Sequence, residues 1–253
     1  MASYQALEVA SFTRWIQHQH PALAQRAESW FHPAPHAFDD DIVGYCVRMT
    51  DAEMLIAVIP DELLPASIAK AAPRRRSSFV AGRLCAERAL AQLGHLVSVP
   101  SGPAGEPIWP MGADGSITHN ELIACAAATS RAIASAMGID SEVIVDEAGC
   151  PAIEQLCCTE QERVTWVHAD NRSLAVTLIF SAKEAYYKAI FPIARRYVDF
   201  HEVEVTGIDW RRGELSLKPI PERSLAAQVP PALCRFRVDD EMVHTSVVLL
   251  QSK

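Results

Sequence analysis

The chain has 253 residues, of which 49% are hydrophobic and 21% are charged, a composition that fits a globular protein and excludes disordered, collagen-like and coiled-coil chains. Its 23 basic and 31 acidic side chains give a net charge of −8, which excludes a protein that coats nucleic acid or anionic lipid through its overall field. Seven cysteines without Cys-x-x-Cys spacing, the lack of a secretory leader pattern and the lack of a long apolar run predict a cytoplasmic protein.

The first half predicts two strands, at 41–48 and 54–59, that pair antiparallel. A helix is expected from about 74 to 93, and it stops at Gly94, because glycine readily takes the left-handed conformation that ends helices. The run of prolines and glycines over residues 100–110 must be an extended loop. The residues that follow it, 115–120, are read as a continuation of this loop.

The second half predicts strands at 123–129 and 134–140, and then a helical region over 153–191 that is interrupted near 170–171 and restarts at Ser181. Four further strands are expected at 201–206, 214–218, 235–238 and 242–250. The strands form adjacent groups and do not alternate regularly with helices. This order predicts an α+β fold with antiparallel sheets.

Asp140 and Glu142 form the first group of candidate functional residues. They are two residues apart at the end of a predicted strand, so their carboxylates share one face. Paired carboxylates suit a magnesium ion that also contacts substrate phosphates. An exposed acidic loop after the strand is the alternative.

The second group is the segment Ser181-Ala182-Lys183-Glu184, followed by Lys188. The spacing Ser181-x-x-Glu184 is typical of a capping box at a helix start, and Glu184 with Lys188 is typical of a surface ion pair. Alternatively, Glu184 is a further metal carboxylate and the lysines neutralise a phosphate.

The third and fourth groups are basic. Arg76 and Arg83 are seven positions apart on the predicted helix, which puts them within roughly 20° of each other, so both can reach one anion. Arg74 and Arg75 point elsewhere, and Arg83 can instead pair with Glu87 as a solvated ion pair. His119 can donate to a phosphate or serve a structural role.

Together these groups resemble the 4′-phosphopantetheinyl transferases, in particular the branch typified by enterobactin synthase component D. The similar blocks follow the family's order over residues 74–205. They are Arg74-Arg75-Arg76-x-x-Phe79-x-x-Gly82-Arg83-x-Cys85-Ala86, Gly105-Glu106-Pro107-x-Trp109-Pro110-x-Gly112, Gly115-Ser116-Ile117-Thr118-His119, Gly138-Ile139-Asp140-x-Glu142, Phe180-Ser181-Ala182-Lys183-Glu184-Ala185-x-x-Lys188 and Asp199-Phe200-His201-x-Val203-Glu204-Val205.

The resemblance implies a monomeric pseudodimer of two similar α/β halves, 1–123 and 124–253, with the active site in the cleft between them. It implies transfer of the phosphopantetheine arm of coenzyme A to a serine of an apo acyl or peptidyl carrier protein, with release of adenosine 3′,5′-bisphosphate. The branch favours siderophore, nonribosomal peptide or polyketide biosynthesis. No nucleic acid partner is expected.

The resemblance also implies residue roles. Asp140, Glu142 and Glu184 would hold Mg²⁺, and Glu184, or a water on the metal, would take the serine proton. Lys188 would neutralise the leaving phosphate, with Lys183 as a further catalytic candidate. The coenzyme A 3′-phosphate and adenosine would be gripped by Arg76, Arg83, Thr118 and His119.

The chain departs from the family at Ala104 and Glu106, because many members carry a lysine or arginine in this stretch. The departure bears on the affinity for coenzyme A. Two alternative functions remain at this point. One is a module that binds coenzyme A or a carrier protein without transfer, and the other is a Mg²⁺-dependent phosphodiesterase.

Overall fold

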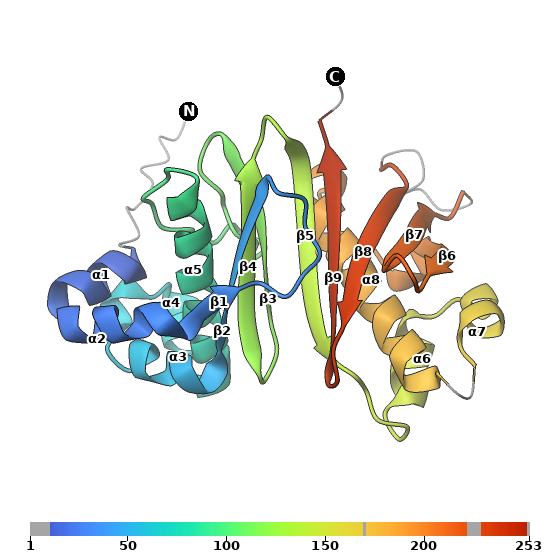
Figure 1. Cartoon of the computed structure of the whole chain (residues 1–253), viewed down its shortest axis with the longest axis horizontal. Helices are drawn as coiled ribbons and strands as arrows, with labels where there is room; N and C mark the ends of the chain where they lie inside the picture. The colour runs from blue at the N-terminus through green and yellow to red at the C-terminus, as the bar shows by residue number, and fades with distance from the viewer. Residues whose placement is uncertain (1–10, 169–170, 222–228, 252–253) are drawn as a thin grey trace. The chain divides into compact units, whose positions relative to one another are not determined.

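The computed structural model describes residues 11–168, 171–221 and 229–251. It divides into two compact units (Figure 1). The first comprises the described parts of Met1–Ala34 and Ile42–Ser130, and the second comprises Pro35–Asp41 and the described parts of Arg131–Lys253. Each unit has its own antiparallel sheet and its own buried core.

The first unit contains a four-stranded sheet with the strand order β1-β2-β4-β3. Its strands are β1 (Phe31–Pro33), β2 (Ile42–Arg48), β3 (Ala113–His119) and β4 (Ile123–Ser130). Its helices are α1 (Phe12–Gln19), α2 (Pro21–Ala27), α3 (Met49–Ile56), α4 (Ala66–Ala69) and α5 (Pro73–Gln92), with 3-10 turns η1 (Glu28–Trp30) and η2 (Asp61–Leu63).

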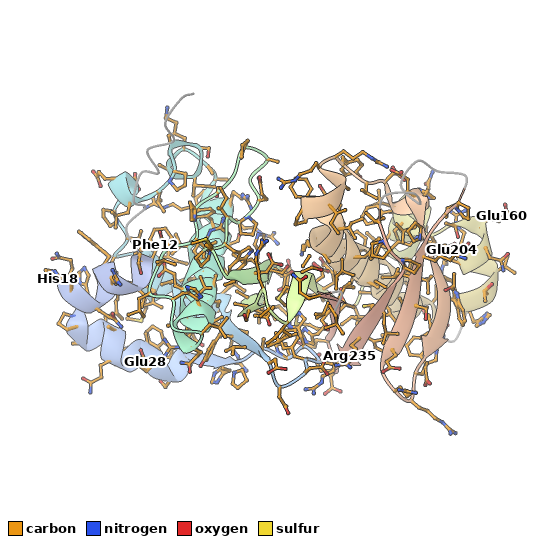
Figure 2. All side chains as sticks on the ribbon, turned by 90° about the horizontal axis from the view of Figure 1, so that it is seen from above. Phe12, His18, Glu28, Glu160, Glu204 and Arg235 are labelled. Carbon is orange, nitrogen blue, oxygen red and sulfur yellow. The ribbon has the colours of Figure 1, made fainter. Side chains whose placement is uncertain are left out.

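Helix α5 packs on β2, β3 and β4 and is largely buried. Small residues permit the close approach: a Cβ atom on Gly82 would lie 2.7 Å from Cγ2 of Ile117 on β3. Phe12, labelled in Figure 2, packs edge-on against Phe79 of α5 with ring centroids 6.4 Å apart. The first core therefore surrounds this helix.

The second unit contains a five-stranded sheet with the strand order β5-β9-β8-β7-β6. Its strands are β5 (Ala134–Val143), β6 (Val203–Asp209), β7 (Glu214–Pro219), β8 (Ala232–Val238) and β9 (Met242–Leu250). Its helices are α6 (Cys150–Cys157), α7 (Glu160–Trp166) and α8 (Arg172–Ala194), with the 3-10 turn η3 (Phe200–Glu202).

Helix α8 packs on β5 and β9. A Cβ atom on Gly138 of β5 would collide with the carbonyl oxygen of Ala185, so glycine at this position allows the helix to lie directly on the strand. The contact brings the carboxylates of β5 close to the polar side chains of α8.

Several predicted elements are confirmed. The α+β class with antiparallel sheets is observed, and the helix predicted at 74–93 is α5, which ends before Gly94 at φ +83°. Strands occur where they were predicted around 41–48, 123–129, 134–140, 214–218, 235–238 and 242–250. The strand expected at 201–206 is observed from Val203, after the turn η3.

Three predictions are wrong. Residues 54–59 are not a strand, because α3 covers Met49–Ile56, and β2 pairs instead with β1 and β4. The predicted loop at 115–120 contains most of β3. Helix α8 does not restart at Ser181 but runs through it, so Ser181 and Glu184 form no capping box.

The described residues include no helix that combines the length and the apolar character needed to cross a membrane.

Candidate active site

Strand β5 and helix α8 form a charged cluster in the second unit. Asp140 is buried on β5, and Nζ of Lys188 on α8 donates to its Oδ1 at 2.7 Å and to the carbonyl oxygen of Ile139 at 3.0 Å. Glu142 is two residues further along β5, so the alternation of a strand puts it on the same face as Asp140. The predicted pair of carboxylates therefore faces α8.

Glu184 precedes Lys188 by about one helical turn, so both side chains lie on one side of α8. Burial raises the pKa of the Glu184 carboxyl. The positive charge of Lys188 lowers this pKa, and the negative charge of Asp140 raises it again. Glu184, Lys188 and Asp140 thus influence one another electrostatically.

The chemistry of these side chains fits a magnesium ion, because carboxylate oxygens are the protein ligands that Mg²⁺ prefers. Within the described ranges, no three His, Cys, Asp or Glu side chains are gathered in a metal-holding arrangement. The Lys188 ammonium supplies the positive charge next to Asp140 in this structure. Metal binding at Asp140, Glu142 and Glu184 would therefore require Lys188 to share or release Asp140.

Lys183 lies elsewhere, in the interior of the unit. Its side chain is 1% exposed, and its ammonium donates to Glu162 Oε2 at 2.8 Å and to the carbonyl oxygens of Cys157 at 2.8 Å and Phe200 at 3.0 Å. Three acceptors match the three protons of the ammonium group. This environment favours a structural role for Lys183.

Glu162 is a residue that the sequence reasoning missed. Its side chain is fully buried and accepts hydrogen bonds from the backbone N–H groups of Val205 at 2.6 Å and Thr159 at 2.7 Å, in addition to the Lys183 ammonium. The Thr159-x-x-Glu162 spacing, a capping box at the start of α7, was the available signal.

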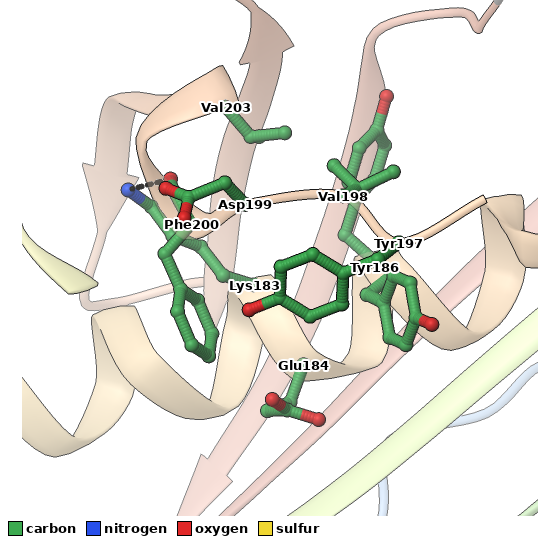
Figure 3. A pocket seen from close by; sticks show the side chains of 9 residues that line it. Lys183, Glu184, Tyr186, Tyr197, Val198, Asp199, Phe200 and Val203 are labelled. Atoms are coloured by element: carbon green, nitrogen blue, oxygen red, sulfur yellow. Dashed lines mark hydrogen bonds between the residues drawn. The ribbon is translucent and has the colours of Figure 1, made fainter. Parts of the chain in front are cut away.

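A small pocket of about 40 Å³ lies next to Glu184 (Figure 3). Aromatic side chains form much of its wall, and the rings of Tyr187 and Tyr197 have centroids 6.0 Å apart. The pocket is lined by Lys183, Glu184, Tyr186, Tyr187, Tyr197, Val198, Asp199, Phe200 and Val203. Glu184 thus borders an environment that is largely apolar.

The basic residues of the first unit have separate partners. Arg76 forms an ion pair with Asp61 and donates to the carbonyl oxygen of Ile59 at 3.2 Å. Arg83 is buried, and it donates to the carbonyl oxygen of Val99 at 2.6 Å and to Oγ of Ser101 at 3.0 Å. The expected convergence of Arg76 and Arg83 on one point is therefore not what their contacts show.

Arg83 remains cationic in this environment. Its guanidinium lies over the ring of Phe79, 4.6 Å from the centroid. Burial, with a smaller contribution from the charge of Arg75, lowers the pKa of Arg83 to about 10.

Arg75, which the helical angle had excluded, lies next to His119. Its Nη1 is 3.4 Å from Nε2 of His119, on the last residue of β3. Thr118 is buried on the same strand. The long arginine side chain, rather than the angle at its Cα, determines what it reaches. Arg75 and His119 are in contact, and together with the buried Arg83 of the same helix they are called the basic set below.

Two family descriptions match the chain in sequence order. The 4′-phosphopantetheinyl transferase N-terminal domain matches residues 63–129, and the 4′-phosphopantetheinyl transferase superfamily domain matches residues 136–235. The two matches cover the charged cluster of the second unit and the basic set of the first.

Individual relatives agree with this match. 4′-Phosphopantetheinyl transferase PptT of Mycobacterium tuberculosis is 33% identical over 197 residues, which are 72% of this chain and 82% of PptT. 4′-Phosphopantetheinyl transferase Npt of Nocardia iowensis is 35% identical over 55% of this chain and 62% of its own length. Enterobactin synthase component D of Salmonella typhimurium is 31% identical over 58% of this chain and 61% of its own length. The chain thus spans about three fifths of the length of Npt and of component D.

Proposed function

Because the chain belongs to the 4′-phosphopantetheinyl transferase superfamily, we propose that it transfers the phosphopantetheine arm of coenzyme A to a carrier protein. The acceptor is a serine hydroxyl of an apo acyl or peptidyl carrier protein, and adenosine 3′,5′-bisphosphate is released. The observation that carries the proposal is the cluster of Asp140, Glu184 and Lys188, in which acidic and basic groups meet beside a pocket.

Glu184 is the general base in this proposal. Its position at the edge of the pocket lets its carboxylate accept the proton of the attacking serine. Loss of that proton makes the hydroxyl a better nucleophile toward the β-phosphate of coenzyme A. The P–O bond to the serine forms as the bond to the departing nucleotide phosphate breaks.

Lys188 neutralises the charge that develops on the departing phosphate. Its Asp140 contact fixes the ammonium on the same face as the carboxylates, where a pyrophosphate would bring negative charge. Asp140, Glu142 and Glu184 would hold Mg²⁺, which supplies charge neutralisation for a bound pyrophosphate. Lys183, by its buried contacts, is a positioning residue for α8 in this scheme.

The 3′-phosphate and adenosine of coenzyme A are assigned to the first unit. Arg75 and His119 form the more exposed part of this set, and Arg83 is its buried part, with its guanidinium donating to the carbonyl oxygen of Val99. Arg76 and Thr118 remain candidates for the same ligand. Local basic groups of this kind would let a chain of net charge −8 bind a polyanion.

The similarity to enterobactin synthase component D supports a carrier protein of siderophore, nonribosomal peptide or polyketide biosynthesis. We further propose that the chain acts in the cytoplasm as a monomer, and that its two units correspond to the two halves of a pseudodimer.

The test is incubation of the protein with coenzyme A, Mg²⁺ and a panel of apo carrier proteins, followed by mass spectrometry. The expected result is a mass gain of one phosphopantetheinyl group on the carrier serine. Binding without any mass gain would favour a module that only sequesters its partner. Hydrolysis of coenzyme A in the absence of carrier would favour a phosphodiesterase. Either result contradicts the proposal.

A further inference from the structure

A buried polar chain lies behind the carboxylates of β5. Oγ of Ser141 is 3.1 Å from Nε2 of His36 and 3.0 Å from Nδ1 of His244, and Nε2 of His244 is 3.2 Å from Oδ2 of Asp239. His36 Nε2 is also 3.0 Å from the backbone oxygen of Asp140. Ser141, His36 and His244 are each at most 2% exposed.

This chain of hydrogen-bonded side chains lies on the face of the sheet opposite α8. Ser141 stands between Asp140 and Glu142 on β5, so its side chain points to the other face. It is directly opposite His244 in the β5–β9 register. The neighbour of His244, Thr245, points toward α8, where its Oγ1 lies 2.8 Å from Oγ of Ser181.

Residues 35–41 cover this second face. Ser246 Oγ donates to the carbonyl oxygen of Ala37 at 2.8 Å, and Arg235 (labelled in Figure 2) forms an ion pair with Asp39. The ring of His36 stacks on Phe38, with centroids 5.6 Å apart, and meets His244 edge-on at 5.5 Å. His36 is therefore held firmly against β5.

Hydrogen-bond chemistry fixes where the protons are. A carbonyl oxygen only accepts, so His36 Nε2 carries a proton and donates to Asp140. Within the described residues, Nδ1 of His36 is buried and has no hydrogen-bond partner, so a second proton on this ring would be unsatisfied. His36 is thus the neutral Nε2–H tautomer.

The same argument applies at the other end. An ionised carboxylate only accepts, so His244 Nε2 donates to Asp239, and the bare Nδ1 of a neutral His244 accepts from the Ser141 hydroxyl. The Ser141 oxygen also lies within reach of the His36 Nε2–H. The bonds run in one direction, from His36 through Ser141 and His244 to Asp239.

The order Ser141, His244, Asp239 has the connectivity of a hydrolase triad, but the serine is 0% exposed. A second histidine also lies against its hydroxyl. No substrate can reach this oxygen in the folded protein. These hydrogen-bonded side chains are therefore not a second catalytic centre.

We infer that His36, Ser141 and His244 are positioning residues that hold the β5 backbone so that Asp140 and Glu142 present their carboxylates to one cation. The inference rests on the proposed metal site. The direct bond from His36 to the Asp140 carbonyl fixes the peptide of one ligand, and the Ser141 contacts fix the residue between the two ligands. Hydrogen-bond partners behind a metal ligand commonly contribute about 10- to 100-fold to metal affinity.

The test measures Mn²⁺ binding to the full chain in the presence of coenzyme A and without carrier protein, from the electron paramagnetic resonance signal of free Mn²⁺. Ser141→Ala and His36→Leu are expected to raise the Kd for Mn²⁺ about tenfold, at the lower end of the range for such partners, because the bonds reach the ligand through its backbone. His36→Gln, whose amide replaces the Nε2–H donor, is expected to stay within about twofold of the wild type.

Ser135→Ala is the matched control. Ser135 is on the same strand, and its hydroxyl donates to the carbonyl oxygen of Leu249 at 2.9 Å, away from the carboxylates. Equal Kd values for the Ser141 and Ser135 variants would overturn the inference, and so would equal losses in His36→Gln and His36→Leu. A wild-type chain that binds no Mn²⁺ would instead overturn the proposed metal site.

A measurement on the wild type covers the case in which a variant does not fold. Long-range ¹H–¹⁵N correlation spectra are expected to show both His36 and His244 as Nε2–H tautomers. A proton on Nδ1 of either ring would contradict the direction of the chain and overturn the inference.

Discussion

The buried pair of Lys183 and Glu162 gives a sharp test of whether Lys183 acts in catalysis or in structure. The substitution Lys183→Met keeps a long flexible side chain and removes the ammonium group. The carboxylate of Glu162, at 0% exposure, then loses its counter-charge in the interior of the second unit. Removing one partner of a buried ion pair typically costs about 3–5 kcal/mol of the free energy of unfolding.

This loss is large compared with the total stability of a protein, which is usually about 5–15 kcal/mol. For a chain of this size, each kcal/mol corresponds to about 2–4 °C in Tm, so Lys183→Met is expected to lower Tm by roughly 6–20 °C. Circular dichroism during heating measures the shift. Transfer activity is measured at a temperature at which the variant is folded.

A second variant separates the two roles. In the double variant Lys183→Met with Glu162→Gln, the buried charge is removed while the amide oxygen still accepts from a backbone N–H group, either that of Val205 or that of Thr159. We expect it to recover at least about 1 kcal/mol relative to Lys183→Met, because a neutral amide is less costly to bury than an unpaired carboxylate.

Activity decides the interpretation. If Lys183 is a positioning residue, the folded double variant keeps its transfer activity within about tenfold of that of the wild type. Loss of a proton-transfer group typically lowers the rate about 100-fold or more. A Lys183→Met variant that is as stable as the wild type and yet inactive would refute the structural role. Such a result would make Lys183 a catalytic residue.

The other predictions concern groups with different partners. Glu184→Gln is expected to lower kcat by about 100-fold or more at nearly unchanged Tm, because an amide cannot accept the serine proton; activity close to that of the wild type would exclude Glu184 as the base. Arg75→Ala is expected to raise the KM for coenzyme A about tenfold, which corresponds to the loss of one charge-assisted hydrogen bond. Arg74→Ala is the control and is expected to change the KM little, because the Arg74 side chain is 76% exposed. Equal effects of the two substitutions would contradict the assignment of the basic set to coenzyme A. The two hydrogen bonds from Arg196 lower the pKa of Glu202 below its ordinary 4.5, so this pair stabilises the fold above pH 4.5, and its contribution is lost as the pH falls through the lowered pKa. Arg196→Met is therefore expected to lower the free energy of unfolding at pH 7 and to lower it progressively less below pH 4.5 in denaturant titrations, and a pH-independent difference would contradict this assignment.

The sequence predicted those elements whose local signals agree with their packing. Helix α5 has a proline at its first residue and a left-handed glycine after its end, and both signals point to the observed limits. Strand β5 was predicted over 134–140, and the two-residue spacing of Asp140 and Glu142 correctly predicted that they share one face of it. In these places the local signals of the sequence were sufficient.

The wrong predictions arose where tertiary packing overrides a short pattern. Ser181 has the spacing of a helix start, but its hydroxyl contacts Thr245 of β9, and the helix continues because its apolar faces are buried on both sides of that point. The run at 54–59 is apolar, yet Leu55 and Ile56 are buried as the end of a helix. A short apolar run does not distinguish a buried strand from a buried helix.

The candidate site was predicted in part because its chemistry is local in sequence. Asp140 and Glu142 are neighbours on one strand, and Glu184 and Lys188 are neighbours on one helix. The pairing of Glu162 with Lys183 and that of His36 with Ser141 could not be predicted in this way, because the partners lie 21 and 105 residues apart in the chain. Arg75 was missed for another reason: the angle at a Cα atom does not limit what a long side chain can reach.

Helix α8 explains why neighbouring residues of one motif have such different roles. Successive residues on a helix differ by about 100°, so the side chains of Lys183 and Glu184 leave α8 in different directions, although both border the small pocket. Lys183 points into the core and pairs with Glu162, while Glu184 and Lys188 lie toward β5 and influence Asp140. The interior pair ties α8 to α7, and the outer pair has the catalytic roles in the proposed mechanism. The close contact at Gly138 sets the distance between α8 and β5, so a glycine two residues before Asp140 is part of the same arrangement. The motifs at 138–142 and 181–188 therefore lie together in one structural unit; in the proposed mechanism the strand provides the carboxylates and the helix provides the base and the cation.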